Sequence, residues 1–405
     1  MLPATLDLAR QADYFWALLP EIVLAVWGML VLMVDVFQKG NRSEPSRPGI
    51  TWLSLAGVGL AAAANLLLLG MRDVSATGMV AVDDFRVFIN FVCLLAAALT
   101  LLVSHGYLDA RGMNRGEFHA LVLFAALGML LMAGARDLMM VFIGLEVMSV
   151  AIYVLVGFDR MDPRSSEASL KYFLLGAFSS AFFLFGIALT WGALGTTNLT
   201  LIGDVTGVQA ASPMLLAGIA LVLVGFGFKV AVMPFHSWTP DAYEGAPTPV
   251  TALMSTGVKA AAFAAFFRVF VIGFIGAYSH WVELMAWLAV LTMFGANLVA
   301  MTQGSVKRML AYSSIAHAGY LLVALTAAND EGLAAFLFYL LAYTLMTAGA
   351  FGVVIAHARG DDERVTLEDF AGYARRSPLM AAVFSVFLLS LAGFPLTAGF
   401  IGKLF

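Results

Sequence analysis

Apolar stretches, each long enough to cross a lipid bilayer, follow one another along this chain of 405 residues. A transmembrane helix needs about 20 mostly apolar residues, because the hydrocarbon core offers no hydrogen-bond partner to exposed backbone. Charged residues make up only 12% of the chain, whereas a soluble domain carries about 25%. The sequence therefore predicts an all-α fold, a polytopic transmembrane helix bundle. About twelve helices are predicted, over residues 14–37, 50–71, 85–104, 118–134, 138–158, 169–192, 213–233, 248–273, 280–301, 306–327, 332–357 and 379–405.

Composition also argues against several kinds of site. Cys93 is the one cysteine, so the chain cannot build a disulfide framework or a cysteine-based metal or iron–sulfur site. The six histidines are scattered along the chain. The net charge of −4 is small, and this argues against nucleic acid as a partner. The first apolar stretch is too long for a cleaved signal peptide. We expect no cofactor and no metal in this chain.

The distribution of basic residues predicts the orientation. Cytoplasmic loops of membrane proteins are enriched in Lys and Arg. The N-terminal segment and the even-numbered connections hold mainly Arg10, Arg72 and Arg136. We therefore expect the N-terminus outside and the odd-numbered connections in the cytoplasm. Those odd-numbered connections hold Lys39, Arg42, Arg47, Arg111, Arg115, Arg160, Arg164, Lys307, Arg308, Arg359, Arg364, Arg375 and Arg376.

Four charged residues lie well inside the predicted helices, and they are the first candidates for proton transfer. They are Glu146, Lys229, Lys259 and Lys403. A charge at the centre of a bilayer is unfavourable by roughly 2.5–3.5 kcal/mol, so such residues usually mark ion or proton pathways. Burial lowers the pKa of a lysine and a nearby carboxylate raises it, so a Glu–Lys pair is an adjustable proton carrier. Glu146 and Lys229 form that pair if the fifth and seventh helices touch.

Weaker candidates lie nearer the helix ends. Lys171 either extends to the cytoplasmic interface or takes part in the pathway. His317 lies near the middle of the tenth helix and is either a relay or a packed histidine. His236 and Lys307 are further candidates, although Lys307 is also explained as a positive-inside anchor. Glu21 is either a subunit contact or a relay. The acidic run Asp361, Asp362 and Glu363 is interpreted as a solvated loop.

Prolines interrupt the seventh and twelfth helices close to two of the lysines. Pro234 follows Lys229, and Pro395 precedes Lys403. Broken helices beside ionisable residues are typical of transporters. Helices seven and twelve differ by five crossings, so equivalent elements run in opposite directions. This predicts two inverted five-helix repeats, helices 4–8 and 9–13, with broken helices 7 and 12. The corresponding segments are 1–117, an N-terminal three-helix segment; 118–273, the first repeat; and 274–405, the second repeat, incomplete at its C-terminus.

Several sequence motifs resemble the antiporter-like membrane subunits of respiratory complex I. The resemblance covers the chain from about residue 118 to its end, and the long proline-rich segment is its most specific part. The matching pieces are Gly-Leu-Glu at 144–146 with Tyr153 and Gly157, EASLKYF at 167–173, FKV at 228–230, PFHSWTPDAYEGAPTPV at 234–250, KRMLAYSSIAHAGY at 307–320, and GFPLTAGFIGK at 393–403.

The resemblance implies a proton-translocating membrane subunit of NADH-quinone oxidoreductase in a bacterial inner membrane. It implies the Glu146–Lys229 pair, a central Lys259 and a terminal Lys403. Protons would enter near Lys171 or His236, load Lys229, pass Lys259 and His317, and leave by Lys403. NADH, FMN, iron–sulfur clusters and quinone are expected in partner subunits. Expected partners are other membrane subunits and lipid, with no soluble small-molecule substrate bound directly.

Two alternatives stay open, and one departure from the family is evident. The chain is alternatively a subunit of a multisubunit sodium/proton antiporter or membrane-bound hydrogenase. In another class, it is a structural scaffold whose charges merely pair. Family members continue for about two more helices beyond the position of Lys403, so we expect this sequence to be part of a longer protein.

Overall fold

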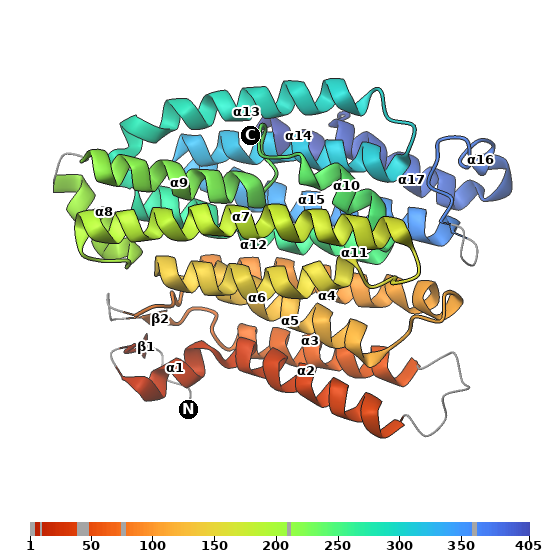
Figure 1. Ribbon diagram of the computed structural model, residues 1–405, viewed down its shortest axis with the longest axis horizontal. Helices are drawn as coiled ribbons and strands as arrows, with labels where there is room; N and C mark the ends of the chain where they lie inside the picture. Colours follow the sequence, from red (N-terminus) through yellow and green to blue (C-terminus); the bar gives the residue numbers. More distant parts are fainter. Residues whose placement is uncertain (1–4, 9, 39–47, 74–77, 209–211, 359–362) are drawn as a thin grey trace.

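Long helices lying side by side form the whole molecule (Figure 1). The computed structural model describes residues 5–8, 10–38, 48–73, 78–208, 212–358 and 363–405. Within these ranges, ten helical stretches are long and apolar enough to cross a membrane. They are α2 (Leu19–Gln38), α3 (Pro48–Leu66), α4 (Asp84–Ala110), α5 (Gly116–Ala133), α6 (Leu138–Val156), α7 (Pro163–Leu194), α14 (Val306–Ala327), α15 (Asp330–His357), the composite helix 248–273, and η3 (Ile275–Ala277) with α13 (Tyr278–Ala300).

The two remaining predicted spans are the broken ones. Helix α9 (Pro213–Lys229) ends at Lys229, and the chain resumes as helix α10 (Trp238–Gly245). Helix α17 (Pro378–Ala392) stops before Pro395, and α18 (Ala398–Leu404) follows the break. The structure thus confirms the polytopic helical fold and both breaks. Whether the two halves are inverted repeats stays a prediction.

Short elements at the ends of the bundle were not predicted. Strands β1 (Thr5–Leu6) and β2 (Arg72–Asp73) pair in parallel. Helices α8 (Leu199–Val208) and α16 (Tyr373–Arg376) lie between long helices in the sequence. The strands, α8 and α16 escaped prediction because each is too short or too polar to give the signal of a membrane span. Helix α1 (Gln11–Ala17) precedes α2, and the predicted helix 14–37 runs through the break between them at Leu18.

The composite helix 248–273 lies at the centre of the bundle. It consists of α11 (Thr248–Leu253), the π-helical turn η1 (Met254–Val258), α12 (Lys259–Phe267) and a second π-helical turn, η2 (Arg268–Gly273). In its most apolar part 89% of the residues are buried, whereas 22% are buried in the corresponding part of the span that contains α13. Large apolar side chains such as Trp287, Phe294 and Leu298 cover the outer face of α13. The composite helix is therefore the core of the molecule, and the outer face of α13 suits lipid or a neighbouring subunit.

Small residues allow the closest helix contact. A Cβ atom added to Gly128 of α5 would lie 2.4 Å from the backbone nitrogen of Met148 in α6. Without a side chain at this position the two backbones approach each other closely, as is common between membrane helices. This contact fixes α6, which carries Glu146, against the rest of the bundle.

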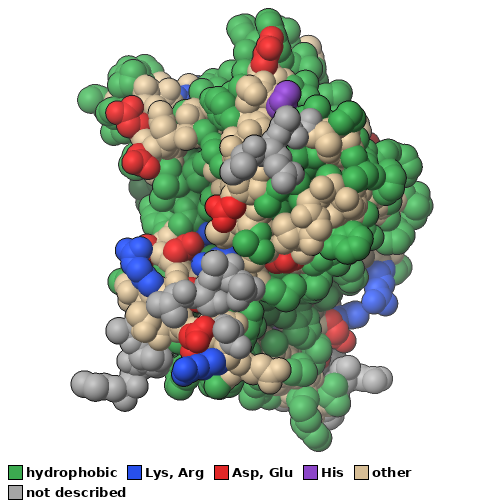
Figure 2. All heavy atoms as spheres, turned by 90° about the vertical axis from the view of Figure 1, so that its left-hand side faces the viewer, with side chains coloured by type: hydrophobic (Ala, Val, Ile, Leu, Met, Phe, Trp, Pro, Cys, Tyr) green, Lys and Arg blue, Asp and Glu red, His purple; other side chains and the backbone are tan. Residues whose placement is uncertain are grey.

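The two ends of the bundle differ in their charged loops. One end of the bundle carries the α4–α5 and α6–α7 connections, which line a charged pocket, the basin. We call this end the basin end; it is the right-hand side of Figure 1. The opposite end shows scattered charged side chains among large hydrophobic areas (Figure 2). The basic residues Lys39, Arg42, Arg47 and Arg359 lie outside the described residues, as do Asp361 and Asp362.

Candidate functional site

Lys229 is buried at the C-terminal end of α9, with only 4% of its surface exposed. Its ammonium group donates a hydrogen bond of 2.8 Å to Ser149 Oγ and a longer one of 3.4 Å to the Tyr172 hydroxyl. The C-terminal end of a helix carries partial negative charge, which favours a cation there. The helix break and these hydroxyls therefore stabilise a buried charge at this position.

Glu146 and Lys229 are neighbours without direct contact. Among the described side chains no ion pair joins them. Instead the Glu146 carboxylate accepts a hydrogen bond from Ser180, and the ammonium bonds to Ser149, three residues beyond Glu146 on α6. Residues three apart lie on the same face of a helix, so α6 presents both groups towards Lys229. A cavity of about 10 Å³ between Ser149, Ser180 and Lys229 is close to the smallest space that holds a water.

Lys259 faces the other half of the molecule. It begins α12, directly after the π-helical turn, and is 3% exposed. Its ammonium donates to Ser314 Oγ and to the Ser314 carbonyl, both at 2.6 Å. Tyr343 of α15 donates to the same Ser314 hydroxyl at 2.8 Å. Ser314 thus joins Lys259 to a tyrosine of the second half.

His317 continues this chain of polar groups one turn further along α14. Its Nδ1 forms a hydrogen bond with the Tyr339 hydroxyl. The imidazole ring also packs against Tyr343 and Tyr320, with centroid distances of 5.0 and 5.9 Å. The Lys403 ammonium lies 4.6 Å from the centre of the Tyr320 ring. Lys259, His317 and Lys403 are therefore brought together through tyrosines.

Lys403 is positioned by the second helix break. It donates a 2.7 Å hydrogen bond to the carbonyl of Leu391, in the last turn of α17. Gly393 ends α17 with a φ of +82°, and a Cβ there would lie 3.0 Å from the Lys403 side chain. Both the positive φ and the close approach favour glycine. Lys229 is thus the last residue of the helix that precedes its break, whereas Lys403 lies on α18, after its break, and its ammonium reaches the carboxyl end of α17.

Two of the weaker candidates lie apart from these chains. Lys171 of α7 is half-exposed and forms ion pairs with Glu167 at 2.8 Å and with Asp241 at 3.0 Å. Its neighbour Tyr172, not Lys171 itself, reaches Lys229. His236 lies between α9 and α10, and its Nδ1 is buried without a partner among the described atoms.

Lys307 is completely buried at the basin end, where it bonds to Glu363 at 2.8 Å and to the Ala246 carbonyl at 2.7 Å. Glu363 also accepts hydrogen bonds from Tyr107 and from Thr248. The interpretation of Glu363 as a solvated loop residue is therefore wrong, because this carboxylate compensates a buried lysine. Burial would raise the pKa of Glu363, but Lys307 and the hydrogen bonds from Lys307 and Tyr107 hold it at about 2.

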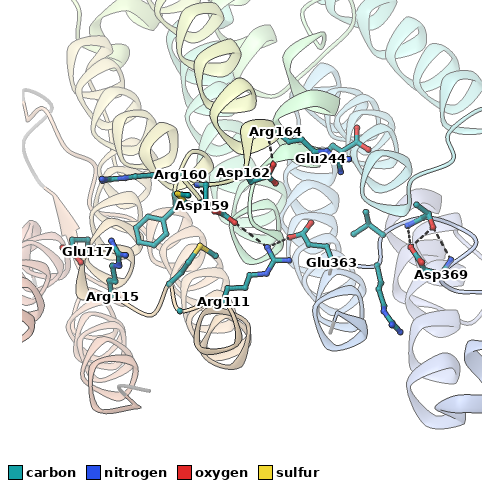
Figure 3. Close-up of a pocket in the computed structure, with 17 residues that line it drawn as sticks. Arg111, Arg115, Glu117, Asp159, Arg160, Asp162, Arg164, Glu244, Glu363 and Asp369 are labelled. Atoms are coloured by element: carbon teal, nitrogen blue, oxygen red, sulfur yellow. Dashed lines mark hydrogen bonds and ion pairs between the residues drawn. The ribbon is translucent and has the colours of Figure 1, made fainter. Parts of the chain in front are cut away.

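Glu363 faces a charged basin of about 890 Å³ (Figure 3). Arg111 lies 3.8 Å from Asp159 and 3.7 Å from Glu363 across this basin. Arginines and carboxylates alternate around it, so it is suited to hold water and exchange protons with it. The other labelled residues that line it are Arg115, Glu117, Arg160, Asp162, Arg164, Glu244 and Asp369.

Little in the sequence marks the hydroxyl groups that bond to the charged residues. Ser149, Ser180, Tyr339 and Tyr343 are common residues in membrane helices, and of these only Ser149 lies at helical spacing from a charged residue, Glu146. No group of three or more His, Cys, Asp or Glu side chains suited to a metal occurs in the part of the chain that the structure describes.

Known proteins share both the sequence and the fold. The sequence pattern of the family described as "NADH:quinone oxidoreductase/Mrp antiporter, TM" matches residues 135–405. NADH-quinone oxidoreductase subunit N of Trichlorobacter lovleyi is 47% identical over 390 residues, which are 96% of this chain and 79% of that protein. A chain of respiratory complex I from Thermus thermophilus, solved with bound aureothin, is 39% identical with a TM-score of 0.78, covering 95% of this chain and 81% of that one.

A more distant likeness concerns the fold alone. A chain of the Mrp complex from Dietzia sp. superposes with a TM-score of 0.77 at 24% identity, covering 98% of this chain and 74% of that one. The match over residues 135–405 spans more than half of the sequence, and the identity to curated relatives extends over nearly all of it. This chain belongs to the NADH:quinone oxidoreductase/Mrp antiporter transmembrane family.

Proposed function

We propose that this chain is a proton-translocating membrane subunit of an NADH-quinone oxidoreductase, the counterpart of subunit N. The observation that carries the proposal is the series of buried ionisable groups, Lys229, Lys259, His317 and Lys403, at mid-helix or at helix breaks. Lys229, Lys259 and His317 each bond to a hydroxyl group able to accept and donate protons, while Lys403 bonds to the Leu391 carbonyl. Buried charges of this kind are unfavourable for insertion, so a purely structural protein has little reason to keep them.

The proposed path has two clusters. Glu146, Ser149 and Lys229 form the first, and Lys259, His317 and Lys403 form the second. Protons enter the first cluster, transfer to the second and leave by Lys403. The half-exposed Lys171 and the partly buried His236 are the candidate uptake points for the first cluster. The ion pair of Lys307 and Glu363 lies at the basin end of the second cluster.

The basin end faces the cytoplasm in this proposal. Arg111, Arg115, Arg160 and Arg164 gather there (Figure 3), as the enrichment of basic residues in cytoplasmic loops requires. The N-terminus then lies on the periplasmic side of a bacterial inner membrane. The segments 1–117, 118–273 and 274–405 serve as an N-terminal helical segment and two inverted halves of the translocation unit.

Redox chemistry belongs to partner subunits in this proposal. NADH, FMN, iron–sulfur clusters and quinone are bound there, and this chain receives energy only through contacts with neighbouring membrane subunits. The exposed apolar face of α13, with Trp287 and Phe294, suits such a neighbour or lipid.

The test is proton pumping by the complete complex in proteoliposomes. Lys229→Ala is expected to lower the number of protons moved per NADH oxidised, because the first cluster loses its carrier. Arg376→Ala, an exposed cation on α16, is the control and should leave that ratio unchanged. A wild-type ratio in assembled Lys229→Ala complex would rule out the assignment.

A further inference from the structure

Aromatic side chains pack between the helices that carry the two clusters. Helices α9 and α12 meet through Phe226 and Phe266, whose rings stack at 4.8 Å. On another side, Tyr172 stacks on Trp238 at 4.3 Å, and the indole N–H of Trp238 is committed to the Phe228 carbonyl. In the described structure no chain of hydrogen bonds links Lys229 to Lys259. Transfer from Lys229 to Lys259 therefore has to pass these aromatic side chains through water, whereas a supply of protons from the basin end would reach Lys259 without crossing them.

The composite helix carries hydroxyl groups between Lys259 and the basin end. Thr248, Thr251 and Ser255 precede Lys259 at intervals of three or four residues, the spacing that places side chains on one face of a helix. All four are buried, with at most 3% of their surface exposed. Successive groups are separated by about 5 Å along the axis, at a rise of about 1.5 Å per residue, a gap that one water can bridge.

Helix α15 packs against this face and adds two further hydroxyls. Tyr343 bonds to Ser314, the acceptor of Lys259. Thr347, one helical turn nearer the basin end, is 3% exposed, and its hydroxyl lies beside the Tyr343 hydroxyl without a well-formed hydrogen bond to any described atom. A buried polar group without a partner is rare and usually marks a bound water. Thr347 therefore indicates where water enters between the helices.

At the basin end these hydroxyls begin beside Glu363. Thr248 donates to the Glu363 carboxylate at 3.1 Å, and the same carboxylate holds Lys307 and Tyr107. Glu363 also lines the charged basin (Figure 3). Only Glu363 thus lies between the first hydroxyl of the series and a space large enough to hold water.

We propose that Thr248, Thr251, Ser255 and Thr347 form a polar seam that delivers protons from the basin to Lys259, independently of Lys229. In each step a water or hydroxyl accepts one proton and releases another, and the last proton is accepted by the neutral Lys259 amine after it has discharged towards His317. Glu363 is a positioning residue that holds Thr248 and Lys307 at the mouth. This inference rests on the proposed function, since it assigns one of that function's uptake routes.

The experiment compares valine and alanine variants in the assembled complex. Thr347→Val with Ser255→Ala removes two hydroxyls from the seam at nearly constant side-chain volume. The matched control for Thr347→Val is Thr344→Val, because Thr344 is equally buried on α15 but its hydroxyl donates to the Leu340 carbonyl of its own helix. Ser255 also donates to a carbonyl of its own helix, that of Ala252, so Ser255→Ala is measured alone as well. Protons moved per NADH and the rate of quinone reduction are measured in proteoliposomes beside Lys229→Ala.

The double variant is expected to lose as many protons per NADH as Lys229→Ala, and the control is expected to keep the wild-type ratio. Thr347→Ser keeps the hydroxyl and is expected to restore the ratio that Thr347→Val alone lowers. A wild-type ratio in the double variant, with a lowered ratio in Lys229→Ala, overturns the seam and leaves the proposed function standing. Wild-type ratios in both overturn the proposed function itself. An equal loss in Thr344→Val assigns the effect to packing and also overturns the seam.

Discussion

Hydroxyl groups decide how the buried charges of this protein are held. Lys229 and Lys259 each donate to a serine, Ser149 and Ser314. A hydroxyl accepts from an ammonium and can also donate onward, so each serine stabilises the charged lysine without neutralising it. A direct carboxylate partner would hold the proton more firmly. This arrangement suits a group that must both take up and release a proton.

Removing the acceptor of Lys229 should therefore slow proton transfer. In Ser149→Ala the protonated lysine loses a hydrogen bond of a kind worth roughly 1.5–3 kcal/mol, and each 1.4 kcal/mol corresponds to a factor of ten. We expect proton pumping by the complex to fall by about tenfold, measured as the initial rate of internal acidification in proteoliposomes. Ser385→Ala is the control, because Ser385 is exposed and bonds only to its own helix. Equal rates in the two variants would show that Ser149 has no such role.

At the scale of helices, the sequence predicts where the chain crosses the membrane and where it breaks. The apolar stretches and the prolines at 234 and 395 are local signals, and the structure confirms both. Contacts between helices depend on packing, which sequence spacing does not determine. The pair Glu146 and Lys229 is an example, because Ser149 rather than Glu146 bonds the ammonium. Likewise, nothing local to Glu363 indicates that it compensates a buried lysine 56 residues away.

The contact between α5 and α6 gives a prediction at this scale. Gly128→Ala places a methyl group 2.4 Å from the Met148 backbone nitrogen, and backbone cannot move aside as a side chain can. Overpacking of this kind costs about 1–3 kcal/mol. We expect a lower melting temperature of the purified complex, followed by intrinsic fluorescence. Gly106→Ala in α4, with nothing within 4 Å of the added Cβ, should not lower it, because alanine is the better helix former. A Gly128→Ala variant as stable as Gly106→Ala would contradict the close packing.

At the scale of the whole molecule, two ion clusters tie the N-terminal helices to the centre. At the basin end, Tyr107 of α4 bonds to Glu363, the partner of Lys307. At the opposite end, Arg268 of the composite helix forms an ion pair of 2.6 Å with Asp83, which caps α4. The composite helix is thereby held at both ends against α4, while its middle carries Lys259. π-Helical turns flank α12 on both sides, and Lys259 directly follows the first of them.

Glu363 makes this account testable through pH. Its pKa of about 2 lies below the ordinary value of 4.5, so its contribution to stability is complete above about pH 4.5 and is lost as the pH falls towards 2. Glu363→Gln should lower the unfolding free energy near pH 7 by up to about 3 kcal/mol, since one pKa unit corresponds to about 1.4 kcal/mol and partial exposure reduces the effect.

Thermal unfolding of the detergent-solubilised protein between pH 7 and 3 measures this difference. The gap between the wild type and Glu363→Gln should narrow below pH 4.5. Glu368→Gln, on the exposed part of the same loop, provides the comparison and should show no gap. A gap that stays constant down to pH 3 would contradict the role of the charged carboxylate.

The central claim, that these buried charges move protons, is tested most directly by the ratio of protons moved to NADH oxidised in assembled complex carrying Glu146→Gln or Lys259→Ala. We predict that both variants assemble and reduce quinone, but with a ratio below that of the wild type and of Arg376→Ala. A scaffold whose charges merely pair would instead keep the full wild-type ratio in both variants, and that result would contradict the account.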